Sequence, residues 1–104
     1  MKKSDIVEAI AADEGSTFVI GEQVLIRTVT FYVTGRITRI STTGITTFLH
    51  LEDAAWISDT GRFMDAIETG TLGEIEPVTT PVRVNIATAI DVYHWNHPLP
   101  KKQK

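Results

Sequence analysis

Apolar and polar residues alternate along most of this chain, and a period of two is typical of β-strands that bury one face. The alternation is clearest between residues 23 and 40, where one side carries Val29, Phe31, Val33, Gly35 and Ile37. The length of this segment and the glycine within it predict either one strand with a bend or bulge, or two strands joined by a tight turn.

Two further alternating segments predict hairpins. The turn-forming residues 41–44 precede Ile45, Thr47, Leu49 and Leu51, which are expected to return as the partner of the first strand. Residues 82–86 and 90–95 alternate around a turn near residues 87–88, so we expect a second hairpin there. Residues 73–81 contain two prolines and are expected to form a loop that crosses a sheet edge.

Residues 51–70 break the alternation at the centre of the chain. Phe63 and Ile67 lie four residues apart, with Ala66 beside them, and predict a short helix with one apolar stripe. Gly70 is expected to end this helix, and Asp59 or Thr60 to cap its first amides.

These elements predict an α+β fold in which antiparallel β hairpins form a small sheet or half-barrel, with one short central helix and a short N-terminal helix. A chain of 104 residues is long enough for one domain. Residues 1–22 are expected to form an N-terminal extension with a short helix and a lead-in strand, and residues 23–97 a single β-rich domain. Residues 98–104, with two prolines and three lysines, are expected to be a mobile basic tail.

Composition narrows the range of partners. The formal net charge is −3, which argues against binding of polymeric nucleic acid, because that binding needs a basic face. No apolar run approaches the length of a membrane span, and the first fifteen residues carry acids that a signal peptide lacks. The absence of cysteine excludes disulfides and cysteine-bound zinc. We expect a cytoplasmic protein without membrane contact, metal site or cofactor.

Two short motifs are compatible with catalysis, but their surroundings favour other interpretations. Asp59-Thr60-Gly61 matches the signature triplet of aspartic proteases, yet the residues after it have a helical pattern. His94 and His97 lie three residues apart near a strand end, a position that does not bring both imidazoles onto one metal ion. No nucleophile lies in a recognisable elbow, so we expect no enzymatic activity.

Two residues are candidates for binding by themselves. Arg27 shares the side of the apolar set, so it is either half of an ion pair with an acid such as Asp53 or an anion-binding group. Trp56 follows two small alanines and is either a core or interface anchor, or one wall of a pocket.

The order of several short motifs also resembles that of a known family. The motifs are Ile26-Arg27-Thr28 at the opening of a strand, Gly35 within it, the junction Leu51-Glu52-Asp53-Ala54, a short helix ending at Gly70, and the strands from Val84 to Ile90. Together they resemble small phage-encoded proteins, and among these the Thoeris anti-defence sponges, which bind cyclic ADP-ribose signals and, in some members, cyclic oligonucleotides. This chain has Ala55-Trp56-Ile57 where those proteins carry basic and aromatic residues.

The resemblance implies that the protein sequesters a cyclic nucleotide immune signal, without chemistry, in the cytoplasm of an infected bacterial host. It also implies a homo-oligomer, either a dimer or a hexamer, with a small phosphorylated nucleotide as its partner. The expected ligand-binding residues are Trp56, Tyr32 and Tyr93 for stacking, Arg27, Arg62 and Arg83 for phosphates, and Asn85 and Thr28 for sugar or base edges.

Alternatives remain open at this point. Arg62 is also explained as a surface residue of the first helical turn, and Asn85 as a residue that shapes a turn. The competing hypothesis for the whole chain is a structural or assembly protein of a phage virion that oligomerises through its β strands.

Overall fold

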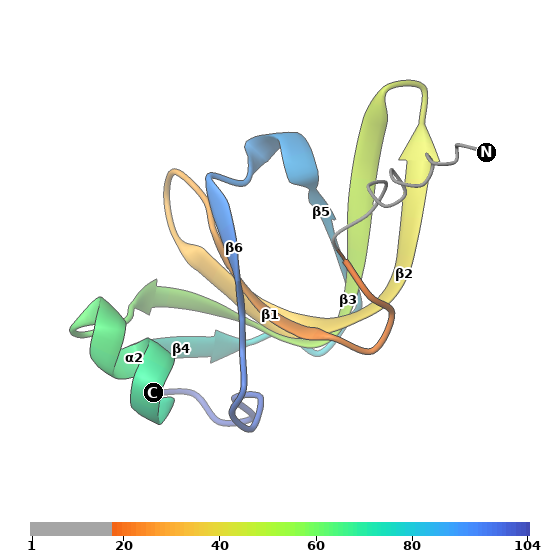
Figure 1. Cartoon of the computed structure of the whole chain (residues 1–104). Coiled ribbons are helices and arrows are strands. Elements are labelled where there is room, and N and C mark those ends of the chain that lie inside the picture. Colours follow the sequence, from red (N-terminus) through yellow and green to blue (C-terminus); the bar gives the residue numbers. More distant parts are fainter. Residues whose placement is uncertain (1–17) are drawn as a thin grey trace.

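The computed structural model describes residues 18–104, which form one antiparallel sheet and one α-helix (Figure 1). The short helix expected near the N-terminus lies outside the described residues. The elements in chain order are β1 (Gln23–Arg27), β2 (Tyr32–Thr43), β3 (Thr46–Asp59), α2 (Phe63–Thr69), β4 (Glu74–Pro77), β5 (Val82–Asn85), the 3-10 helix η2 (Ile86–Thr88) and β6 (Asp91–His94). The predicted α+β class with a mostly antiparallel sheet is confirmed.

The sheet is organised around the long, curved β2–β3 hairpin. Its strand order is β4-β3-β2-β1-β6, and β5 pairs with β3 beyond the end of β4. One edge of β3 pairs with β2, and its other edge pairs with two short strands, β5 along Phe48–Leu51 and β4 along Ala55–Asp59. The curvature of the two long strands turns the sheet into an open trough (Figure 1).

The long alternating segment is two strands, one of the two predicted alternatives. β1 and β2 are joined by a turn in which the amide of Thr28 donates to the Phe31 carbonyl at 2.9 Å. Bulges are also present, one in β2 at Thr38, between the pairs Ile37–Leu51 and Arg39–His50, and a larger one in the partner strand β3. Thr34 pairs with Ala55 and Arg36 with Glu52, so two residues of β3 face Gly35 alone.

Gly35 is required at this bulge because the two strands approach closely. A Cβ built on Gly35 would lie 2.9 Å from the Cβ of Leu51, closer than side chains tolerate. Across from it, Asp53 takes a φ of 53°, an unusual value for a residue with a side chain. The bulge therefore changes the direction of β3 near its midpoint.

The prediction of a second hairpin from residues 82–95 is wrong. β5 pairs with β3, and β6 pairs with β1, so the two short strands lie at different edges. The cause is η2: the Asn85 side chain accepts a hydrogen bond from the amide of Ala87 and starts a helical turn that carries the chain across the trough. The loop prediction for residues 73–81 is also wrong in part, because β4 forms there.

The central helix is confirmed, and its start differs from the expectation. α2 ends at Gly70, which adopts the left-handed conformation with a φ of 79°. The N-cap is Arg62, without a side-chain cap, because β3 continues to Asp59. The Asp59 carboxylate accepts from the amide of Gly61 in the intervening turn, so the predicted cap at Asp59 or Thr60 is wrong.

The sheet buries both of its faces around β1, where Val24, Leu25 and Ile26 are all fully buried. The trough interior contains a cluster formed by Val24, Ile26, Val33, Ile37, Leu49, Leu51, Ala54 and Val84. The opposite face is covered by α2 and the C-terminal segment, with a cluster formed by Leu25, Ala55, Ile57, Ala66, Leu72, Trp95 and Leu99. Among residues 18–104, no helix has the length and apolarity of a membrane span.

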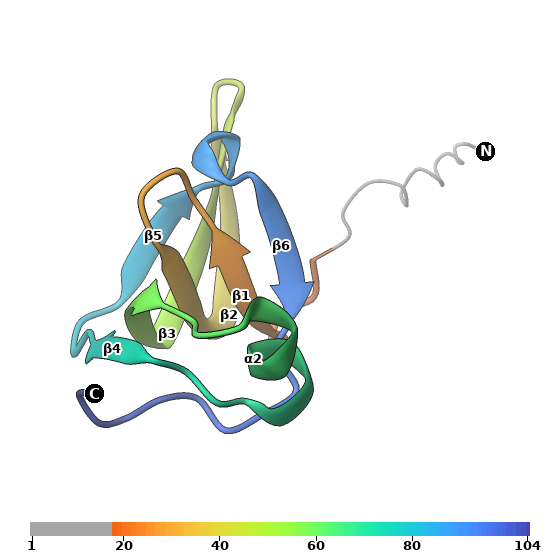
Figure 2. The same ribbon diagram turned by 90° about the vertical axis from the view of Figure 1, so that its left-hand side faces the viewer.

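The C-terminal segment, expected to be a mobile tail, lies along β4 (Figure 2). Ile75 and Lys104 exchange two backbone hydrogen bonds of 2.8 and 3.0 Å. Leu99 is buried, and the indole of Trp95 donates to the carbonyl of Pro98. These contacts cover the outer edge of β4.

Candidate binding groove around Trp56

An apolar hollow of about 400 Å³ lies between the β1–β2 turn and β5. Its walls come from three separate parts of the chain: the β1–β2 turn with the start of β2, Trp56 of β3, and β5 with η2. The lining residues are Thr28, Val29, Thr30, Phe31, Val33, Trp56, Val82, Arg83, Val84, Asn85 and Thr88. We call this hollow the Trp56 groove.

Trp56 is the central side chain of the groove. Its neighbours Ala55 and Ile57 are buried beneath α2, so the alternation of β3 sends the indole to the opposite face. Phe31 contacts the indole edge-on, with ring centroids 4.9 Å apart and planes at 75°. Trp56 nevertheless keeps 48% of its surface exposed. This exposure excludes a buried core position and agrees with either an interface anchor or a pocket wall.

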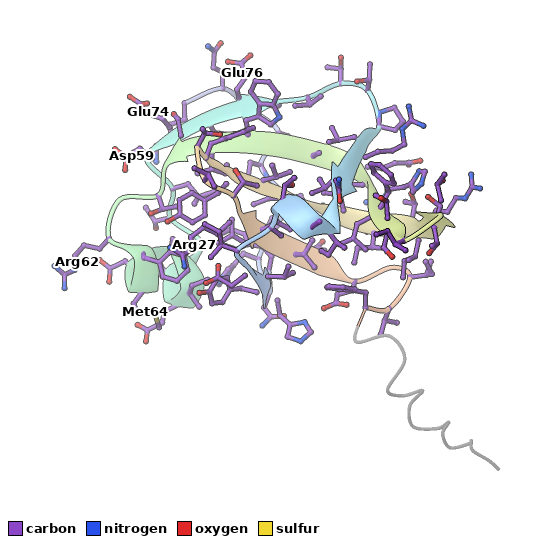
Figure 3. The ribbon with its side chains drawn as sticks, turned by 90° about the horizontal axis from the view of Figure 1, so that it is seen from above. Arg27, Asp59, Arg62, Met64, Glu74 and Glu76 are labelled. Atoms are coloured by element: carbon purple, nitrogen blue, oxygen red, sulfur yellow. The ribbon has the colours of Figure 1, made fainter. Side chains whose placement is uncertain are left out.

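A second hollow, of about 570 Å³, borders the same indole on its other side, lined by Phe31, Trp56, Ser58 and Glu76. Its polar rim is at β4, where Ser58 donates to the carboxylate of Glu74 at 2.9 Å. Figure 3 shows Glu74 and Glu76 projecting outward beside this edge. Within residues 18–104 the indole N–H of Trp56 has no hydrogen-bond partner.

The polar residues of the groove divide into two kinds. Thr28 donates to the Phe31 carbonyl at 2.6 Å, and Asn85 accepts from the amide of Ala87, so both maintain the shape of the walls. Arg83 is exposed and makes no ion pair within the described part of the chain. Arg83 is therefore the cation that this groove offers to an anionic ligand.

Four of the eight residues predicted to bind ligand line this groove: Thr28, Trp56, Arg83 and Asn85. The other four do not. Arg27 and Tyr93 bind Asp91, Tyr32 stacks on Phe63, and Arg62 lies at the start of α2.

Arg27 forms the ion pair that was one of its two predicted alternatives, but with Asp91 rather than Asp53. The β1–β6 register places the two residues opposite each other. Nε and Nη2 of Arg27 each lie 2.9 Å from a carboxylate oxygen of Asp91, and the Tyr93 hydroxyl donates to the same carboxylate at 2.9 Å. This arrangement uses the bidentate geometry of the guanidinium within the protein.

The ionisation of this cluster follows from its hydrogen bonds. Arg27 lowers the pKa of Asp91 below its ordinary value, and Asp91 in turn raises the pKa of Arg27. The hydrogen bond to Asp91, together with desolvation, raises the pKa of Tyr93. All three groups are therefore fixed in their usual charge states at neutral pH.

Tyr32 and Arg62 are placed by α2. Tyr32 stacks on Phe63 with centroids 5.9 Å apart, and Phe63 meets Tyr93 edge-on at 5.1 Å. Arg62 has a side chain 88% exposed and projects away from the sheet (Figure 3), with Asp65 4.0 Å away. Its position agrees with the helix-surface interpretation.

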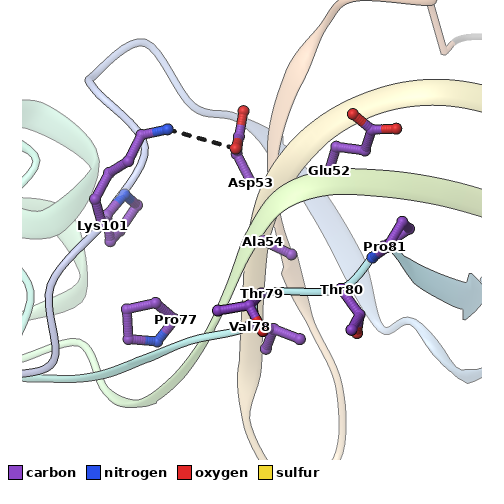
Figure 4. Close-up of a pocket in the computed structure, with 10 residues that line it drawn as sticks. Glu52, Asp53, Ala54, Pro77, Val78, Thr79, Thr80, Pro81 and Lys101 are labelled. Atoms are coloured by element: carbon purple, nitrogen blue, oxygen red, sulfur yellow. Dashed lines mark ion pairs between the residues drawn. The ribbon is translucent and has the colours of Figure 1, made fainter.

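A separate hollow of about 470 Å³ lies at the β3 bulge (Figure 4). Asp53 is its charged centre and contacts Arg36 Nη1 at 2.6 Å and Lys101 Nζ at 3.4 Å. These cations lower the pKa of Asp53 below its ordinary value. The charges are paired within the chain, so this hollow offers a ligand less than the Trp56 groove does.

The two histidines of the considered metal pair have different partners. His94 Nδ1 lies 2.6 Å from a carboxylate oxygen of Glu22, and His97 Nε2 lies 2.7 Å from the Ile67 carbonyl. In the part of the chain described, no three histidine, aspartate or glutamate side chains are grouped as metal ligands. Both histidines join elements together.

Sequence reasoning missed the other seven groove residues, among them Phe31 and Val82. The alternation assigned Phe31 to the core side of one long strand, and the turn at residues 28–31 places it at the rim instead. The only available signal was the turn-forming character of Thr28 and its neighbours. Comparison with protein-family models, curated proteins and solved structures finds no match to this chain.

Proposed function

We propose that the protein is a non-catalytic binding protein that sequesters a small phosphorylated nucleotide in the Trp56 groove. The observation that carries the proposal is Trp56 itself, half exposed between two hollows with its indole N–H unpartnered among the described residues. A flat aromatic face with apolar walls accepts the ring of a base, and stacking is worth about 1–3 kcal/mol per base.

Charge limits the class of nucleotide. Arg83 is the cation of the groove that has no ion-pair partner among residues 18–104, and the chain as a whole is acidic. This favours a ligand with few phosphates, such as a cyclic ADP-ribose isomer, over a nucleic-acid polymer. The same ligand class follows from the resemblance to the Thoeris anti-defence sponges, and sequestration then needs no chemical step.

A thermal-shift screen against cyclic ADP-ribose isomers and cyclic di- and trinucleotides identifies the ligand. A ligand at one hundred times its Kd stabilises the folded state by about 2.7 kcal/mol, a shift of many degrees for a domain of this size. Absence of a shift with every compound at saturating concentration would contradict the proposal.

Calorimetric titration of Trp56→Ala tests the site once a ligand is found. Removing the stacking platform is expected to weaken binding about 10- to 100-fold. Met64→Ala is the matched control, because Met64 is an exposed apolar residue on α2, away from the groove. Equal loss in both variants would reject the groove as the site.

Arg83→Ala tests the phosphate contact. Loss of a charged hydrogen bond costs about 1.5–3 kcal/mol, so affinity is expected to fall about tenfold or more. Arg39→Ala is the control, since Arg39 is an exposed arginine on β2 outside the groove. Unchanged affinity in Arg83→Ala would remove the phosphate from the proposal while leaving the stacking test intact.

The second candidate function is a subunit of a larger assembly. The observation that favours it is the uncharged hairpin end of β2 and β3, where Ile45 is fully exposed. An assembly protein would ignore nucleotides in the screen above and associate through its strands.

A further inference from the structure

The end of the β2–β3 hairpin projects beyond the rest of the sheet (Figure 1). β1 accompanies β2 only as far as Arg36, and residues 21–22 bond to Ile37. On the other strand, β5 pairs with β3 no further than Phe48. We call the projecting residues 38–48 the arm, and among the described residues its β2 edge has no neighbouring strand.

Beyond Arg39, the arm lacks the features that usually protect a free strand edge. Natural edges carry charged residues or prolines that prevent pairing with another chain. Residues 40–49 contain no proline and no charged residue, although 22% of the chain is Asp, Glu, Lys or Arg. Four threonines give this ribbon a high strand propensity instead.

The tip of the arm is also apolar, and it is fully exposed to solvent. Gly44 has a φ of 61° at the first central position of the turn, which is the pattern of a type II′ turn. This places Ile45 at the outermost point, with its side chain entirely exposed. Ile40 and Phe48, at the base of the arm, are only half-buried.

The absence of charge points to a second copy of this chain as the partner. A two-fold axis brings each residue near the axis against its own copy, so any charge there would meet the same charge. Threonine pairs across an antiparallel ladder are favourable. An antiparallel pairing about Thr42 also places the half-buried Ile40 opposite Gly44 of the other arm, next in sequence to Ile45.

We propose that the β2 edge of the arm pairs antiparallel with the same edge of a second copy, about a two-fold axis near Thr42. The two hairpins then form one continuous sheet across the dimer. This interface does not involve the Trp56 groove, so it holds whether or not the groove binds a nucleotide.

Sedimentation velocity of paired charge variants tests the proposal. The unmodified protein is expected to sediment as a particle of twice the 11.5 kDa chain mass. Thr42→Glu and Thr42→Lys, each alone, place like charges across the axis and are expected to weaken the dimer by at least about tenfold. An equimolar mixture of the two variants is expected to restore the dimer, because opposite charges then face each other.

Two further variants make the result specific. Thr80→Glu, at an exposed threonine in the β4–β5 loop, is expected to leave the dimer intact. Thr42→Cys adds the sole cysteine of the chain and is expected to form a cross-linked dimer on oxidation. An unmodified protein that stays monomeric at high concentration, or a dimer that persists in both single charge variants, would overturn the proposal.

Discussion

Thr34 buries a hydroxyl without a hydrogen-bond partner among the described residues. It lies on β2 opposite Leu25, on the face that α2 covers. Thr34→Val replaces the hydroxyl with a methyl group of similar shape and removes an unsatisfied polar atom. We expect the free energy of unfolding to rise by about 1 kcal/mol, measured by chemical denaturation.

Thr38→Val provides the control for this substitution, because the Thr38 hydroxyl donates to the His50 carbonyl at 3.3 Å. No gain in stability is expected there. A loss of stability in Thr34→Val would mean that its hydroxyl is bound in solution.

The contribution of Asp91 to the free energy of unfolding depends on pH. Its folded pKa is lowered by Arg27, so the stabilisation is present above the unfolded pKa near 3.9 and is lost as pH falls through the folded value. Asp91→Asn is therefore expected to melt at a lower temperature than the unmodified protein at pH 6. The difference in melting temperature between the two proteins should become smaller below about pH 4. A gap that is constant from pH 2 to 6 would show that the carboxylate charge contributes nothing.

At the scale of single elements, local signals predicted α2 and its end well. Phe63 and Ile67 are half-buried against the apolar cluster that contains Ala66, and Gly70 ends the helix. Strand partners were not predictable in this way. The alternation of residues 82–95 is the same whether β5 and β6 pair with each other or with distant strands, and the Asn85 cap decided between them.

Gly70 tests the packing of the helix end against the C-terminal segment. An alanine at this position would have to keep the left-handed backbone conformation of Gly70. Its Cβ would also lie 2.7 Å from Cγ of His97. Gly70→Ala is expected to lose more stability than the roughly 1–2 kcal/mol that the left-handed conformation costs alone. Thermal unfolding followed by circular dichroism measures the loss.

Gly21→Ala isolates the conformational part, because Gly21 has a φ of 95° and open space around it. The difference between the two variants is the cost of the crowding. Adding His97→Ala to Gly70→Ala should recover some of that difference, unless the lost bond from His97 to the Ile67 carbonyl outweighs it. Equal losses in Gly21→Ala and Gly70→Ala would mean that the segment near His97 yields easily.

At the scale of the whole molecule, the sequence predicted which residues could bind a ligand, but not where in the fold they come together. Trp56, Arg83, Thr28 and Asn85 were selected as an aromatic ring, a cation and two small polar groups, and the fold brings them to one groove. Arg27 was separated from them by its register with Asp91, which depends on the pairing of β1 with β6. The groove itself is made by the β1–β2 turn and β5, so only the topology could reveal it.

The most direct measurement of the central claim is a two-dimensional 1H–15N spectrum of the two tryptophan indoles during nucleotide titration. Trp56 is exposed and its N–H has no partner in the described part of the chain, whereas Trp95 is buried and donates to the Pro98 carbonyl. Trp56→Phe assigns the two signals. We predict that the identified nucleotide shifts the Trp56 signal and leaves that of Trp95 in place. A ligand that binds while the Trp56 signal stays fixed would contradict the account.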